Sequence, residues 1–307
     1  MKIIFFGSSS FSVPSLKSIY SSVSCVVTKK TKPKGRGYLL EDNEVKRTAL
    51  SLGLPLIEID SFKDEQAKQI ADFTPDLFVV ASFGLIIPKW ALEIPAIGPI
   101  NIHPSLLPKY RGPSPLQWVI WNGETETGVT IIRMNERMDA GDILYQEKVA
   151  LQPEEDAGTL SDRLSVRASE ILPGVIDEVR INGIHGEPQH EDKATYTPMI
   201  TKEMGRIDWH VGAPEIIRQV RAVVLWPTAF TFLDNKSLKV FKIKPAEDSG
   251  TKKAEPGVIV SVSSEGLEVA AGEGSLILKE VQMENRKRMP ASEFARGYRQ
   301  LTGKQLT

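Results

Sequence analysis

The first half of the chain alternates short apolar runs with stretches of helical periodicity, and this alternation limits the possible folds more than any other feature. The expected strands are residues 2–6, 24–28, 77–81, 99–102 and 128–134. The expected helices are residues 11–21, 43–52, 62–73, 114–122 and 158–181. Such alternation forms βαβ units, whose strands join in a parallel sheet with helices on both faces. We therefore expect a doubly wound α/β fold.

The character of the sequence changes near residue 205. Residues 184–205 are polar, with little periodicity, and are typical of a linker. Beyond them come short β-rich runs broken by Gly, Pro, Asn and Asp, at residues 229–233, 238–243, 257–262, 267–271 and 275–278. This spacing predicts a small all-β barrel or sandwich with one helix at 213–223. The expected domains are thus 1–183 and 206–307, joined by the linker 184–205.

Composition excludes several classes of protein. The chain has 38 Lys and Arg against 39 Asp and Glu, and its 25% charged residues are typical of an ordinary globular protein. No apolar run is long enough to span a membrane, and the N-terminal run is too short for a signal peptide. A single cysteine, Cys25, permits no intrachain disulfide. We expect a cytoplasmic monomer with no membrane partner.

Two polar residues end one of the expected strands. Asn101 and His103 stand two positions apart, so their side chains lie on the same face of the strand, near its carboxyl end. Ligands bind at this edge of open α/β sheets. A lone His is more often structural than catalytic. The pairing with Asn101, and the Pro- and Gly-containing loop 104–112 that follows, favour a catalytic role for His103.

An acidic loop at residues 135–142 could complete the site. Asp139 lies between the strand 128–134 and a further expected strand at 142–151, and taken alone it is most simply a residue of a solvated hairpin turn. Together, however, the three residues are sufficient for acyl transfer between nitrogens. Asn101 can donate to a developing oxyanion, His103 can exchange a proton near neutral pH, and Asp139 can orient the imidazole. No G-x-S-x-G motif and no metal-ligand spacing occur, so we expect neither a serine nucleophile nor a metal.

Three stretches carry a family resemblance: Ile-Asn-Ile-His at 100–103, Ser-Leu-Leu-Pro-Lys-Tyr-Arg-Gly at 105–112, and Met-Asp-Ala-Gly-Asp-Ile-Leu at 138–144. In these stretches the chain resembles formyltransferases that use 10-formyltetrahydrofolate. The wider frame is similar to the members of that family that act on methionyl-tRNA, at residues 3–7, 81–89, 126–131, 206–209, 226–227 and 256–257. The resemblance implies a Rossmann-like catalytic domain and an OB-like, tRNA-binding C-terminal barrel.

The resemblance also implies the reaction and the roles of individual residues. The formyl group of 10-formyltetrahydrofolate would pass to the free amino group of initiator methionyl-tRNA, giving the formylated form used in translation initiation. Asn101, His103 and Asp139 would be the catalytic trio. The folate site would be formed by Ser105, Leu106, Leu107 and Pro108, and by backbone groups of Phe83, Gly84, Leu85 and Ile86.

The chain departs from this family in one place. After the first strand the family usually has Gly-Thr-Pro-x-Phe, where this chain has Gly-Ser-Ser-Ser-Phe at residues 7–11. The turn is preserved, but no role of the family's Thr and Pro carries over. Residue 7 also begins neither G-x-G-x-x-G nor G-x-x-x-x-G-K-[ST], so we interpret Gly7 as a packing turn rather than a phosphate site.

A cluster of cations follows the second expected strand. It comprises Lys29, Lys30, Lys32, Lys34 and Arg36. A solvated loop is the simplest interpretation, but by position the cluster resembles the basic insertion loop of the tRNA-specific members, which approaches the acceptor stem. Lys and Arg clusters are suited to phosphate contacts. Initiator methionyl-tRNA is therefore the expected macromolecular partner.

Two other functions stay open from the sequence. A formyltransferase acting on an amino sugar-nucleotide would share the catalytic trio, and only the basic loop 29–36 favours tRNA over that substrate. A non-catalytic RNA- or folate-binding protein that kept the fold is the second alternative. The intact trio argues against it.

Overall fold

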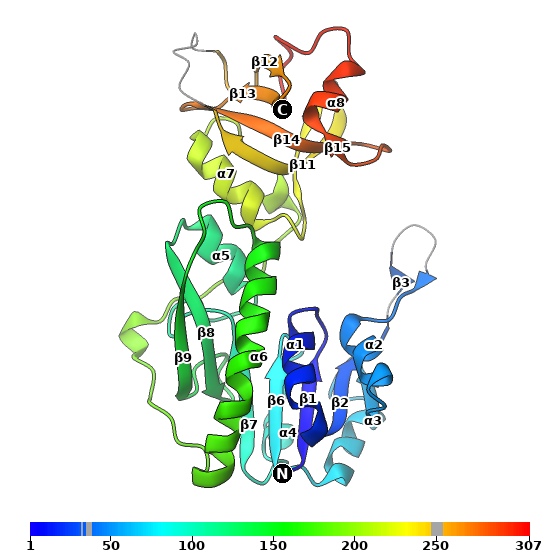
Figure 1. Cartoon of the computed structure of the whole chain (residues 1–307), viewed down its shortest axis with the longest axis vertical. Coiled ribbons are helices and arrows are strands. Elements are labelled where there is room, and N and C mark those ends of the chain that lie inside the picture. The colour runs from blue at the N-terminus through cyan, green and yellow to red at the C-terminus, as the bar shows by residue number, and fades with distance from the viewer. Residues whose placement is uncertain (32, 35–38, 247–253) are drawn as a thin grey trace. The chain divides into compact units, whose positions relative to one another are not determined.

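The chain forms two compact units in the computed structural model, which describes residues 1–31, 33–34, 39–246 and 254–307 (Figure 1). The first unit comprises residues 1–115, 125–151 and 159–198, and the second comprises 116–124, 152–158 and 199–307. Two segments of the first half of the chain thus group with the C-terminal strands. The expected domains 1–183 and 206–307 were continuous, and their boundaries stay a prediction.

The first unit is built on a seven-stranded sheet of order β5-β2-β1-β6-β7-β8-β9. Its strands are β1 (Ile3–Gly7), β2 (Val23–Lys29), β5 (Leu56–Ile59), β6 (Leu77–Ala81), β7 (Gly98–His103), β8 (Glu126–Arg133) and β9 (Ile143–Ala150). A separate two-stranded sheet consists of β3 (Pro33–Lys34) and β4 (Leu39–Leu40). The helices of the first half of the chain are α1 (Ser12–Ile19), η1 (Tyr20–Ser22), α2 (Glu44–Ser51), α3 (Glu65–Lys68), η2 (Gln69–Phe73), α4 (Lys89–Leu92), α5 (Pro115–Trp121) and α6 (Ala157–Asn182).

The prediction of a doubly wound α/β fold with a parallel sheet is confirmed, and two further strands extend this sheet in antiparallel pairing. The first five strands in the sheet are parallel, in the order typical of Rossmann-like folds. Strands β8 and β9 run antiparallel because a hairpin turn, residues 134–142, connects them directly. The expected helix 62–73 is only the short α3 followed by the 3-10 turn η2, and the sequence reading missed β5 and α4.

Helices cover both faces of the sheet, with α1 and α6 toward the viewer in Figure 1. On the opposite face, Phe6 and Val80 pack with residues of η2 and α4 in one apolar cluster. Asn101 is in register with Val80 across the β6–β7 pair, so its side chain lies on this second face. The core therefore fixes which face of the sheet carries the polar end of β7.

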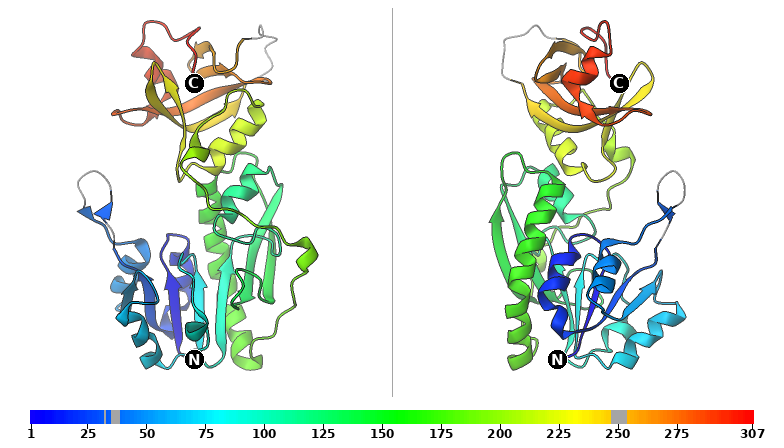
Figure 2. Two further views of the ribbon diagram at one scale, coloured as in Figure 1. Left: turned by 180° about the vertical axis from the view of Figure 1, so that it is seen from behind. Right: turned by 45° about the vertical axis from the view of Figure 1, so that its right-hand side comes forward.

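The second unit is an antiparallel sheet of order β10-β11-β14-β13-β12, with β15 paired to β14 (Figure 2). Its elements are η4 (Glu203–Gly205), α7 (Ala213–Ala222), β10 (Ala229–Leu233), β11 (Lys236–Pro245), β12 (Ile259–Ser263), β13 (Gly266–Ala270), β14 (Ser275–Met283), β15 (Met289–Pro290) and α8 (Ala291–Arg296). The C-terminal residues join its two edges, because Ile259 N donates to Lys304 O while Thr307 and Phe232 exchange backbone hydrogen bonds. The predicted small all-β domain is confirmed.

No helix in the described part of the chain is long and apolar enough to cross a membrane.

Candidate functional site

Asn101 and His103 project from the same face of β7, as their spacing predicted. His103 is only 4% exposed, and Asn101 is half-buried. Asp139 comes to them from the hairpin between β8 and β9. Asn101 Nδ2 donates to Asp139 Oδ1 at 3.3 Å, and His103 Nδ1 lies 3.6 Å from Asp139 Oδ2. The structure therefore brings the three residues of the predicted trio together.

The carboxylate of Asp139 is held from a third direction by the chain that follows β7. Gly112 N donates to Asp139 Oδ2 at 2.8 Å. The backbone of Asp139 has φ +49°, a left-handed conformation that is unfavourable for a residue with a side chain. Two residues later, a Cβ on Gly141 would lie 1.6 Å from Arg133 O, so only glycine fits there. The tight hairpin and its hydrogen bonds thus fix the carboxylate against the polar end of β7.

One nitrogen of the His103 ring is hydrogen-bonded to the backbone. His103 Nε2 lies 2.9 Å from Tyr110 O, and a carbonyl oxygen can only accept, so Nε2 carries the hydrogen. The other nitrogen, Nδ1, faces Asp139. A neutral His103 therefore presents a lone pair at Nδ1, and a protonated His103 presents an N–H at the same place.

Residues 105–108 form a tightly bonded turn beside the trio. Ser105 Oγ donates to Lys109 O, and the hydroxyl of Thr130 donates to Ser105 O and accepts from Leu107 N. The Leu107–Pro108 peptide bond is cis. The Ser105 and Leu107 side chains are buried, whereas Leu106 and Pro108 are half-buried. A ligand would thus meet the latter two or the backbone of the turn.

The loop of residues 82–88 follows β6 at the same edge of the sheet. Phe83 is buried, with its ring centroid 5.4 Å from that of Phe6, whereas Ile86 is 81% exposed. Gly84 has φ +72°, and the position that a Cβ would take there lies 2.6 Å from Lys29 Nζ. The Phe83 side chain therefore packs in the apolar core. Any ligand contact at Phe83 or Gly84 would come from the backbone.

The structure describes only part of the predicted basic cluster. Lys29 ends β2, with its ammonium beside Gly84. Lys30 is ion-paired with Asp64 at 2.9 Å, and this hydrogen bond raises the pKa of Lys30. Lys34 lies in β3, and Lys32 and Arg36 lie outside the described residues. The role of the cluster in binding tRNA stays a prediction.

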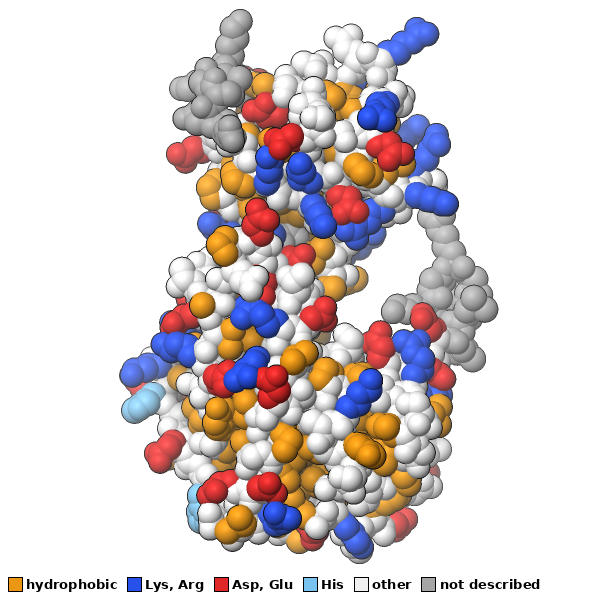
Figure 3. Space-filling model, viewed as in Figure 1, with side chains coloured by type: hydrophobic (Ala, Val, Ile, Leu, Met, Phe, Trp, Pro, Cys, Tyr) orange, Lys and Arg blue, Asp and Glu red, His pale blue; other side chains and the backbone are white. Residues whose placement is uncertain are grey.

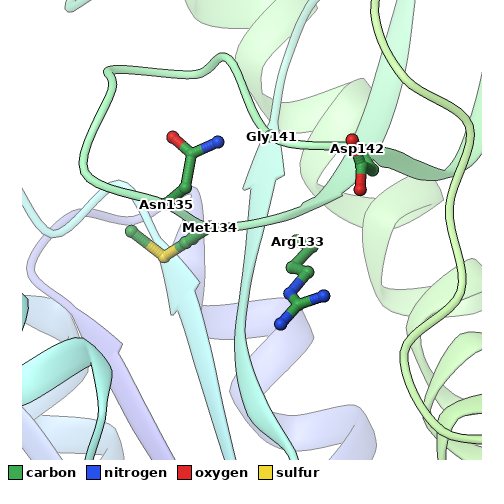
Figure 4. A pocket seen from close by; sticks show the side chains of 5 residues that line it. All are labelled: Arg133, Met134, Asn135, Gly141 and Asp142. Atoms are coloured by element: carbon green, nitrogen blue, oxygen red, sulfur yellow. The ribbon is translucent and has the colours of Figure 1, made fainter.

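Two cavities that share three lining residues open at the base of the hairpin 134–142, and Figure 4 shows the side chains that line the first of them. One, of about 280 Å³, is lined by Arg133, Met134, Asn135, Gly141 and Asp142. The other, of about 330 Å³, shares Arg133, Met134 and Asn135 and continues along Leu92, Ile97 and Pro99. Its lining mixes apolar surface with a few polar groups, as is usual in small-molecule sites. Neither cavity is lined by Asn101, His103 or Asp139, and the second reaches the amino end of β7 at Gly98.

Sequence reasoning missed a buried arginine beside the trio. Arg111 is fully buried, and its guanidinium donates to Gln189, Glu191 and the hydroxyl of Tyr196. The hydrogen bond from Arg111 holds the pKa of Glu191 below its usual range. These partners lie in the segment that the sequence predicted to be a linker. The sequence offered no signal for this cluster, because its members come from two stretches about 80 residues apart.

The one cysteine of the chain is a buried residue of β2. Burial raises the pKa of the Cys25 thiol to about 12, so this group stays protonated at physiological pH. The described part of the chain contains no group of three or more His, Cys, Asp or Glu side chains placed to hold a metal ion.

Comparison with known proteins agrees with this architecture. The family model for formyl transferase matches residues 1–176, and that for the formyl transferase C-terminal domain matches residues 199–299. Methionyl-tRNA formyltransferase from Syntrophus aciditrophicus (strain SB) is 41% identical over 307 residues, covering 99% of this chain and 98% of the relative.

Two solved structures share the fold at 19% identity. Methionyl-tRNA formyltransferase from Clostridium thermocellum has a TM-score of 0.57, over 81% of this chain and 95% of that one. HypX from Aquifex aeolicus in complex with tetrahydrofolic acid has a TM-score of 0.68, over 99% of this chain and 50% of that one. The fold and the matched domains define the chain as a formyltransferase. Within that class it belongs to the methionyl-tRNA formyltransferase family, as its motifs predicted.

Proposed function

We propose that the chain transfers the formyl group of 10-formyltetrahydrofolate to the α-amino group of initiator methionyl-tRNA. The observation that carries this proposal is the convergence of Asn101, His103 and Asp139 on one face of the sheet, within a chain of this family. The free amine would attack the formyl carbon, and the carbonyl electron pair would move onto oxygen. Collapse of this tetrahedral intermediate re-forms the carbonyl, breaks the bond to the folate nitrogen and leaves a proton on that nitrogen.

The three residues divide this chemistry between them. In the described residues, one N–H of the Asn101 amide bonds to Asp139 and the second has no hydrogen-bond partner, so it is available to the oxyanion. His103 offers Nδ1 as the second donor when it is protonated. Asp139 can accept an N–H at Nδ1 of His103, and once the amine has added to the formyl carbon it can take a proton, through water, from the positively charged nitrogen of the intermediate.

The donor site in this proposal comprises the turn 105–108, the trio and the loop that follows β6. Backbone groups of Phe83, Gly84, Leu85 and Ile86 would contact the ring edge, as the family resemblance implies. HypX, which shares the fold, was solved with tetrahydrofolic acid, and this supports a folate donor.

The tRNA would be bound by cations of both units. In the first unit these are Lys29 and its neighbours in the basic loop. In the second unit, Lys and Arg side chains are spread among acidic ones on the face shown in Figure 3. Arg288 lies over the Phe241 ring at 4.1 Å, and Arg206 lies over the Phe232 ring at 5.9 Å. Cations beside aromatic rings suit contacts with both phosphates and bases.

The decisive experiment is formyl transfer from 10-formyltetrahydrofolate to charged initiator tRNA, with charged elongator methionyl-tRNA in parallel. We expect strong preference for the initiator, and binding that weakens steeply as salt is raised. Absence of transfer to either tRNA, while the donor binds normally, would contradict the proposal. A shallow salt dependence combined with transfer to an amino sugar-nucleotide would replace it with the small-substrate alternative.

A further inference from the structure

The side chain of Gln189 lies between the buried Arg111 and the hairpin that carries Asp139. Gln189 Nε2 donates to Asp139 O at 2.8 Å and to Gly141 O at 2.7 Å. Gln189 Oε1 accepts from Arg111 Nε at 3.1 Å and from Arg111 Nη2 at 2.8 Å. Both N–H groups and both lone pairs of this amide are therefore used.

Arg111 determines which way the amide of Gln189 points. A guanidinium group has only donors, so the atom of Gln189 that faces it must be the carbonyl oxygen. The two carbonyl groups on the other side have only acceptors, so they must face the NH2 group. A flipped amide would place donors against donors and acceptors against acceptors. The orientation of Gln189 thus follows from the chemistry of its neighbours.

These hydrogen bonds stabilise the conformation of the hairpin 134–142, which carries Asp139. Asp139 has φ +49°, and the two carbonyl oxygens that Gln189 binds belong to Asp139 itself and to Gly141. The residue after Arg111, Gly112, donates to the Asp139 carboxylate, and the residue before it, Tyr110, accepts from His103. Tyr110 and Arg111 are themselves hydrogen-bonded to Thr195 and Thr197. The segment of residues 187–197 therefore supports the loop that carries the carboxylate and the chain that holds the imidazole.

We propose that Gln189, oriented by Arg111, is a positioning residue that sets the location of the Asp139 carboxylate over Asn101 and His103. This inference rests on the proposed formyl transfer. It assigns a positioning role to Gln189, which lies in the segment that sequence composition predicts to be a linker. Gln189 acts through Asp139 and makes no contact with the reacting atoms.

The test is the substitution Gln189→Glu in the full chain. The new carboxylate still accepts from Arg111, but it turns an acceptor toward the two carbonyl groups and can no longer hold them. We expect kcat to fall about 10²-fold, the size of effect that a displacement of about 1 Å produces. The KM for 10-formyltetrahydrofolate and for methionyl-tRNA should stay within about twofold, since uniform binding is retained. His190→Gln is the matched control, because His190 is exposed and its ring has no hydrogen bond within the described residues.

A double-substitution cycle with Asp139→Ala separates positioning from general structural damage. When the carboxylate is absent, Gln189→Glu should reduce single-turnover rates by less than about twofold. An equal loss in both backgrounds, or a wild-type kcat for Gln189→Glu, would overturn the inference. Should Gln189→Glu fail to fold by circular dichroism, Gln189→Met gives the same test without a buried charge. A wild-type chain that formylates no methionyl-tRNA would instead contradict the proposed function.

Discussion

Thr130 offers the sharpest test of how the turn beside the trio is held. Its fully buried hydroxyl donates to Ser105 O at 2.6 Å and accepts from Leu107 N at 3.3 Å and from Gln146 Nε2 at 2.9 Å. Thr130→Val keeps the shape of the side chain and removes the hydroxyl. It leaves the Ser105 carbonyl and the Leu107 N–H buried without partners, at about 1–3 kcal/mol each. We expect the free energy of unfolding to fall by roughly 2–6 kcal/mol and Tm by about 5–15 °C.

The same strand provides a matched control. Thr127 is also buried in β8, but its hydroxyl has no hydrogen-bond partner among the described residues. Thr127→Val should therefore be neutral or slightly stabilising. Urea unfolding of both variants measures the difference, and the KM for the folate donor should rise only in Thr130→Val if the turn shapes the donor site. Equal losses of stability in the two variants would refute the assignment of these hydrogen bonds.

Three further predictions test other parts of the site. If Asn101 donates to the oxyanion, Asn101→Ala should reduce the single-turnover rate of formyl transfer about 10²–10³-fold. A wild-type rate would exclude Asn101 from that role. The matched control is Asn182→Ala on the surface. Gly141→Ala places a Cβ 1.6 Å from Arg133 O and should abolish formyl transfer. Gly174→Ala lies in the interior of α6 with nothing within 4 Å of the new Cβ, and it should raise the free energy of unfolding by up to about 1 kcal/mol. Activity assays and thermal melts of both variants measure these effects. Cys25, with a pKa of about 12, should resist thiol reagents at pH 8 until the chain is unfolded. Rapid labelling of Cys25 by a thiol reagent in the folded protein would contradict the burial of this side chain. Because the thiol ionises near pH 8.5 in the unfolded chain and stays protonated in the folded one, the free energy of unfolding should decline as the pH rises above about 8.5.

The strands of the first unit were predictable because burial on both faces leaves a local signature. The runs 3–6 and 77–81 are apolar at every position, as is typical of central parallel strands. The direction of β8 and β9 has no such signature. Their residues alternate in the same way whichever direction they run, and only the short hairpin at 134–142 decides it. The short β5 and α4 were missed because each is only four residues long.

The trio was partly predictable for a related reason. Asn101 and His103 interrupt an apolar strand, and this contrast is visible in the sequence. Gln189 offers no contrast, because it lies in a polar stretch and its partner Arg111 is 78 residues away. A segment that binds through hydrogen bonds rather than apolar burial has the composition of a linker. Composition alone therefore cannot separate a free connection from one that supports a site.

The hydrogen bonds around His103 also limit how protons can move in the site. In a relay, one ring nitrogen takes a proton while the other gives one up. Here Nε2–H is directed at a backbone carbonyl of Tyr110, which cannot accept a proton at any physiological pH, so that edge of the ring is closed to exchange. In the proposed reaction His103 would therefore exchange protons only at Nδ1, the nitrogen that faces Asp139. The carboxylate would face the same nitrogen that exchanges the proton, whereas in a serine hydrolase it binds the other nitrogen of the ring. For this reason the position of Asp139, and with it the hairpin held by Gln189, would decide where a proton on Nδ1 is held.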